Sequence, residues 1–138
     1  MIDTLRAPGM IATAGMSAQS ERLLAISQNI ANVQSVGKTP GADPYSRKTV
    51  SFKSEVDNLS GLTMVKVAEY GTDRSPFRVE LDPGSPAADQ NGYVKMPNVN
   101  LLVEMADMRE ANRVYQANLQ VFRQARELVS MTIDLMRT

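Results

Sequence analysis

The fold is decided by the last quarter of the chain, residues 98–138, which reads NVNLLVEMADMREANRVYQANLQVFRQARELVSMTIDLMRT. This stretch contains no proline and no glycine, so nothing in it interrupts a helix. One column at seven-residue spacing is apolar or aromatic throughout: Leu101, Met108, Tyr115, Phe122, Val129 and Met136. The spacing predicts a long amphipathic helix, about 55 Å in length, whose apolar stripe requires a partner helix.

A second amphipathic helix is predicted near the N-terminus. Pro8 and Gly9 should break any helix before Met10, and helical periodicity then continues to about Val33. The apolar column of this helix consists of Met16, Leu23 and Ile30. Small residues in its first two turns permit another helix to approach closely, so we expect the two terminal helices to pair.

The middle of the chain has β character. A loop rich in glycine and proline follows the first helix at residues 37–44, and β-branched or alternating segments predict short strands within residues 45–81. We expect this small β unit to lean on the C-terminal helix, because it is too thin to fold alone. Asn98 or Asn100 is the predicted N-cap of the C-terminal helix.

These elements predict a mainly α fold with a small β-rich middle segment. The long N- and C-terminal helices, in residues 1–34 and 98–138, should pair as an antiparallel coiled-coil-like core, with residues 35–97 as the insertion between them. The C-terminal stripe is longer than the N-terminal helix can cover. We therefore expect the core to be completed on assembly, with the part of the stripe from Phe122 to Met136 serving as an assembly surface.

Composition excludes several classes of function. The chain has 138 residues, enough for about one domain, and its 15 basic and 15 acidic residues balance. A formal net charge of zero gives no electrostatic reason to bind nucleic acid or an anionic membrane. The absence of cysteine and histidine removes disulfides, thiolate metal sites and the commonest general base. No catalytic, cofactor-binding or metal-binding residue is predicted, and we do not expect an enzyme.

Two fragments resemble pieces of chemical motifs, but each is incomplete. Gly37-Lys38-Thr39 lacks the glycine that a phosphate-binding loop needs five residues earlier, where Asn32 stands. Residues 89–92 resemble part of a calcium loop, but Asn98 occupies the position of its closing glutamate. A small soluble enzyme or regulatory module is therefore the weaker interpretation. The sequence has no transmembrane run and no secretory signal, which predicts a cytosolic protein unless export proceeds without cleavage.

Two stretches carry a resemblance to a known family. Residues 14–19, AGMSAQ, and residues 26–32, ISQNIAN, resemble the N-terminal signature of flagellar rod, hook and related axial proteins. Residues 82–100, DPGSPAADQNGYVKMPNVN, are similar to the diagnostic stretch of the proximal-rod subfamily, although Ser85 stands where that subfamily is expected to have a histidine. The match covers nearly the whole chain and is weaker from Val56 to Leu81.

The resemblance implies a structural subunit of the bacterial flagellar basal-body rod. Such a subunit would be exported uncleaved through the flagellar type III apparatus and would lie in the rod that crosses the periplasm. Its partners would be copies of itself and other flagellar rod proteins, without nucleic acid or direct membrane insertion. The alternative is another axial component, such as a different rod protein or a hook-related protein. The residues expected to make assembly contacts are Met16, Leu23, Asn29, Ile30, Asn32, Tyr115, Asn118, Phe122, Leu128, Val129 and Met136.

The two asparagines of the signature have two possible roles. Asparagine has weak helix propensity and readily occupies a helix terminus, so Asn29 and Asn32 could simply end the first helix. Alternatively, one carboxamide bonds backbone exposed at the turn while the other reaches a neighbouring helix.

Overall fold

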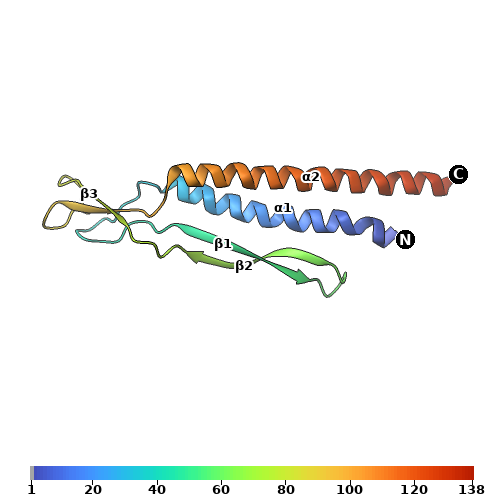
Figure 1. Cartoon of the computed structure of the whole chain (residues 1–138), viewed down its shortest axis with the longest axis horizontal. Coiled ribbons are helices and arrows are strands. Elements are labelled where there is room, and N and C mark those ends of the chain that lie inside the picture. Colours follow the sequence, from blue (N-terminus) through green and yellow to red (C-terminus); the bar gives the residue numbers. More distant parts are fainter. Residues whose placement is uncertain (1) are drawn as a thin grey trace. The chain divides into compact units, whose positions relative to one another are not determined.

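The computed structural model describes residues 2–138 of the chain. Its elements follow in the order α1 (Ile2–Ala31), β1 (Lys48–Val56), β2 (Thr63–Thr72), β3 (Arg78–Leu81), β4 (Tyr93–Met96) and α2 (Leu101–Arg137) (Figure 1). Two long terminal helices with a small β-rich region between them confirm the coarse prediction of a mainly α fold.

The C-terminal helix α2 begins where the sequence predicts. The Oδ1 atom of Asn100 accepts hydrogen bonds from the N–H groups of Leu102 (3.1 Å) and Val103 (3.4 Å), which makes Asn100 the N-cap. Asn98, the other candidate, does not cap the helix: its Nδ2 instead donates to the backbone carbonyls of Asp73 (3.0 Å) and Ser75 (3.1 Å). Because no proline or glycine follows, α2 continues for 37 residues.

The N-terminal helix α1 is longer than predicted, because Pro8 lies inside it and does not end it. Proline removes only one intrahelical hydrogen bond, and tertiary packing outweighs that local cost here. Gly9 lies against α2: a Cβ atom built on it would be 3.7 Å from the Cβ of Ala125 and 3.8 Å from the ring of Phe122. The expected helix start at Met10 is therefore wrong, whereas the predicted end near Asn32 is confirmed to within a residue or two.

The chain divides into two compact units. The first unit contains residues 2–23, 50–69 and 109–138, and the second contains residues 24–49 and 70–108. In the first unit the two helix segments run antiparallel: Gly9 faces Ala125, Gly15 faces Asn118, and Arg22 forms an ion pair with Glu110 at 3.1 Å.

The buried apolar residues of the first unit are small. Where the structure describes burial in this unit, the fully buried apolar residues are all alanines: Ala12, Ala18, Ala111 and Ala125. The large side chains of the predicted columns, Met16, Leu23, Tyr115, Phe122 and Val129, are only half-buried. The helices thus approach closely through methyl groups, as the small residues predicted, while much of the larger apolar surface remains accessible.

Strands β1 and β2 form a two-stranded sheet and are joined by the loop of residues 57–62. In the first unit this hairpin borders α1, because Leu59 and Leu62 share a pocket with Thr4 and Ala7 (Figure 1). Met64 of β2 also lines a groove together with Phe122 and Val129 of α2. The expectation that the β segment leans mainly on the C-terminal helix stays a prediction.

The second unit contains the other two strands. β3 pairs antiparallel with β4, with Arg78 opposite Met96 and Leu81 opposite Tyr93. Val94 is buried, whereas the alternating side chains of Val79 and Leu81 are exposed, so the period-2 pattern predicts the strand but not its burial. The core of this unit is small and partly polar: Ala25, Ile26, Asn29, Ala87, Val94, Pro97, Val99 and Glu104.

Candidate functional site

A fully buried carboxylate lies at the centre of the second unit. Glu104, in the first turn of α2, has 0% exposure. Its Oε1 accepts a hydrogen bond from the Nε of Arg47, and its Oε2 lies 3.4 Å from the Nδ2 of Asn29. A buried charge is tolerated only when it is paired and hydrogen-bonded, so these two partners make the site possible. We call Glu104, Arg47, Asn29 and Tyr45 the Glu104 cluster.

Arg47 connects this cluster to two further acids. Its guanidinium lies 3.6 Å from Asp73 and 3.6 Å from Asp107 in addition to its contact with Glu104. Burial by itself would lower the pKa of Arg47, but the hydrogen bond and charge of Glu104, together with both aspartates, raise it above its ordinary value. Arg47 therefore acts as a permanent cation that ties the loop before β1 to the start of α2.

Asn29 is saturated by contacts within the chain. Its Oδ1 accepts hydrogen bonds from the N–H of Lys48 and the hydroxyl of Tyr45, both at 2.8 Å. Its Nδ2 donates to the carbonyl of Lys48 at 2.9 Å and lies 3.4 Å from Glu104. The carboxamide thus pairs with both backbone groups of Lys48, as a neighbouring strand would.

Tyr45 completes the cluster as a hydrogen-bond donor. Burial, and next the negative charge of Glu104, raise the pKa of the Tyr45 hydroxyl above its ordinary value. The hydroxyl therefore stays protonated and can donate to Asn29 at any physiological pH. The cluster joins the end of α1, the loop before β1 and the start of α2, so its chemistry is that of a structural anchor.

The second asparagine of the signature closes the turn after α1. The Nδ2 of Asn32 donates to the carbonyl of Gln28 at 2.8 Å, and its Oδ1 accepts from the hydroxyl of Ser35 at 2.9 Å. Asn32 thus bonds exposed backbone at the turn, while Asn29 reaches Glu104 on α2 of the same chain. A contact of either asparagine with another subunit stays a prediction.

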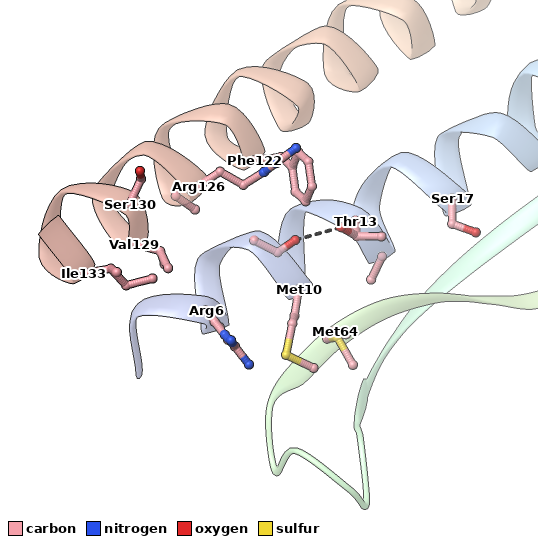
Figure 2. Close-up of a pocket in the computed structure, with 13 residues that line it drawn as sticks. Arg6, Met10, Thr13, Ser17, Met64, Phe122, Arg126, Val129, Ser130 and Ile133 are labelled. Carbon is pink, nitrogen blue, oxygen red and sulfur yellow. Dashed lines mark hydrogen bonds between the residues drawn. The ribbon is translucent and has the colours of Figure 1, made fainter. Parts of the chain in front are cut away.

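An open groove of about 730 Å³ lies in the first unit. Figure 2 shows its walls, which come from α1, from α2 and from β2 near Met64. Two of the predicted contact residues, Phe122 and Val129, line it, and the Arg126 guanidinium lies 6.0 Å from the centroid of the Phe122 ring. We call this the apolar groove; its lining residues are Arg6, Gly9, Met10, Thr13, Ala14, Ser17, Met64, Phe122, Ala125, Arg126, Val129, Ser130 and Ile133.

A separate face of α2 carries large apolar side chains in solvent. Leu128 is 55% exposed and Leu135 is 77% exposed. Together with Val121 they recur at intervals of seven residues. With Met131 they form a face that we call the outer stripe: Val121, Leu128, Met131 and Leu135. Scattered exposed leucines are common, but a row at helical spacing marks a surface that can pack against another helix.

The structure separates the remaining predicted contact residues into two groups. Met136 is 69% exposed near the end of α2, where it remains available to a partner. Met16, Leu23, Ile30, Tyr115 and Asn118 are half-buried. The amide of Asn118 lies against Gly15 of α1, so part of its surface is used within the first unit.

Sequence reasoning missed the importance of Glu104 and Arg47. Nothing in the local sequence pattern places Arg47 beside Glu104, which lies 57 positions further along the chain. The one available signal was that both residues lie in segments that match the axial-protein family. No group of three or more acidic residues, cysteines or histidines within residues 2–138 is arranged to hold a metal ion. Likewise, no helix in that range is long and apolar enough to span a membrane.

Comparison with known proteins agrees with this structural picture. The family described as "Flagellar basal body rod FlgEFG protein C-terminal" matches residues 90–135. The flagellar basal-body rod protein FlgC of Agrobacterium fabrum is 62% identical over 136 residues, covering 99% of this chain and 98% of the relative. FlgC of Salmonella typhimurium is 38% identical, and the match covers 91% of this chain and 92% of the relative. FlgC of Borreliella burgdorferi is 35% identical, and the match covers 92% of this chain and 94% of the relative. The chain therefore belongs to the FlgC family of flagellar basal-body rod proteins, which are structural components of the flagellum.

Proposed function

We propose that this chain builds the proximal part of the rod by helix packing, as a subunit of the tubular drive shaft that crosses the periplasm. Its partners in that shaft are copies of itself and other flagellar rod proteins. The two terminal helices act as a coiled-coil-like core that becomes complete only when neighbouring subunits cover it. The role is mechanical and involves no catalytic step.

The outer stripe of α2 is the observation that carries this proposal. Within the first unit the helices meet through alanines, while Leu128, Met131 and Leu135 remain about half or more exposed. Each large aliphatic side chain gains roughly 1.5–3 kcal/mol when it is fully buried. A row of them at helical spacing gives a neighbouring helix a substantial reason to associate, without any change in the fold of the chain itself.

We also propose that the chain reaches the rod through the flagellar type III export apparatus, without cleavage of a signal peptide. The chain has no cysteine, so it can travel reduced and then remain in an oxidising compartment without forming wrong disulfides. Its alanine-rich helix contact is compatible with unfolding before export, because small side chains contribute little burial energy.

The proposal is tested by placing a charge in the outer stripe. Leu128→Asp, expressed in a strain that lacks the native protein, should still be exported but should be absent from purified basal bodies, and cells should not swim. Val129→Asp, which places a charge in the apolar groove, should likewise be exported but absent from basal bodies. Asn112→Asp is the matched control, because Asn112 is an exposed residue of α2 outside both surfaces. Normal rods built from Leu128→Asp chains would show that helix packing through this face is not required.

A further inference from the structure

The apolar groove has a one-sided charge pattern. Two arginines, Arg6 and Arg126, lie among its lining residues, and no acidic residue does. Neither arginine is in an ion pair within residues 2–138. Figure 2 shows both side chains at the groove together with Met10, Phe122 and Val129. A complementary occupant therefore needs large apolar side chains for the floor and carboxylates for the two cations.

The outer stripe of α2 has the opposite pattern. Glu127 and Asp134 directly precede Leu128 and Leu135, so the two acids are seven residues apart and stand on the same side of the stripe. Both acids are exposed, and neither is in an ion pair within the described chain. The stripe thus offers an apolar row with an acidic border, which is complementary to the apolar floor and the two arginines of the groove.

A chain cannot fill its own groove with its own stripe. The same helix α2 supplies both surfaces, and Leu128 and Ile133 point roughly 140° apart around it at 3.6 residues per turn. The occupant must therefore come from another molecule. A contact between two different surfaces of identical chains is heterologous, so it repeats from copy to copy and produces a ring or an open helical array.

We propose that the outer stripe of α2 of one copy docks in the apolar groove of a second copy, with Glu127 and Asp134 facing Arg6 and Arg126. This inference rests on the proposed rod function and deepens it by naming the two surfaces that meet and the copy of the chain that supplies each. Burial of the stripe supplies the attraction, and the charge pairs fix which face enters the groove.

The experiment exchanges the two charge patterns in full-length chains. A groove variant carries Arg6→Glu and Arg126→Glu, a stripe variant carries Glu127→Arg and Asp134→Arg, and a combined variant carries all four substitutions. Each is expressed in a strain without the native protein, and subunits in purified basal bodies and in the medium are quantified by immunoblot. Arg109→Glu is the matched control, because it reverses an exposed α2 charge that lies outside both surfaces.

Groove and stripe variants should each be incorporated at least roughly tenfold less than the unmodified chain, since reversal places like charges together. The combined variant restores opposite charges at every contact and should return to within about threefold of normal. Its recovery would also show that the four substitutions together are compatible with folding.

Three results would overturn the proposal. Normal incorporation of either the groove variant or the stripe variant would show that the charges do not meet. A combined variant as poor as its parents would show that the two surfaces do not face each other. Loss caused by the groove variant alone would show that the occupant is a different protein. All three leave the rod assignment intact, whereas absence of the unmodified chain from basal bodies would overturn the proposed function itself.

Discussion

Replacement of Arg47 by methionine should be among the most damaging single changes in the second unit. The substitution keeps the unbranched aliphatic part of the side chain but removes the guanidinium that pairs with Glu104. Glu104 is completely buried, so no solvent can replace the lost partner. Among residues 2–138, the remaining hydrogen-bond partner of the carboxylate would be the Nδ2 of Asn29 at 3.4 Å.

The expected loss follows from this burial. Removing one partner of a buried ion pair costs about 3–5 kcal/mol, because the remaining charge is left uncompensated. The contacts of Arg47 with Asp73 and Asp107 are partly solvated and 3.6 Å long, so each adds less than about 1 kcal/mol. Small domains have a free energy of unfolding of about 5–15 kcal/mol, so Arg47→Met should leave the second unit marginally stable.

Urea unfolding followed by far-ultraviolet circular dichroism measures this loss in the purified chain. Lys95→Met is the matched control: the Lys95–Asp43 ion pair is solvent-exposed, so its removal should cost no more than about 1 kcal/mol. A double variant, Arg47→Met with Glu104→Leu, removes both charges and should recover most of the stability lost in Arg47→Met.

Two outcomes would refute the reasoning. If Arg47→Met costs no more than Lys95→Met, the buried carboxylate of Glu104 does not depend on its cation. If the double variant loses as much as the sum of Arg47→Met and Glu104→Leu measured separately, the two side chains are not energetically coupled.

Three further changes test other parts of the structure. Gly15→Leu should destabilise the helix contact by about 1–3 kcal/mol in urea unfolding, because even a Cβ at this position would lie 2.7 Å from the amide of Asn118. Adding Asn118→Ala should recover part of the loss, and no recovery would place the clash elsewhere. Asn29→Asp should cost at least about 1–3 kcal/mol, because it removes the donor to the Lys48 carbonyl; unfolding equal to that of the native chain would contradict this role. Hydrogen bonds from Ser75 hold the pKa of Asp73 below its ordinary value of 3.8. The contribution of Asp73 to folding stability is therefore present above pH 3.8 and is lost as the pH falls through the lower, folded-state pKa. Asp73→Asn should reduce the loss of stability on acidification, and an unchanged acid profile would refute the assignment.

The sequence predicts α2 well because its information is local and repeated. An uninterrupted apolar column and an asparagine at the correct position for an N-cap fix the helix and its start at Asn100. The same local reasoning fails at Pro8, where the cost of one missing hydrogen bond is outweighed by contacts with residues more than a hundred positions away. Propensity at a single position is a weak guide when tertiary contacts compete with it.

Periodicity also overstated the size of the buried side chains. The sequence predicts that the large side chains of the apolar column of α2 face a partner helix, yet the fully buried apolar positions within residues 109–138 are Ala111 and Ala125. A hydrophobic pattern identifies the side of a helix that faces a partner, but not how closely the partner approaches. The Glu104 cluster could not be predicted, because it depends on three segments that are distant in the sequence and meet only in the fold.

The alanine contact between the helices has a consequence for how the first unit resists force. A buried methyl group contributes about 0.8 kcal/mol, so four alanines hold the helices together far less strongly than four leucines would. Such a closely spaced contact fixes the register of the two helices along their length, but a low applied force separates them. We expect the isolated chain to yield at low force in a single-molecule pulling experiment and to become mechanically stiff only when its larger side chains are covered.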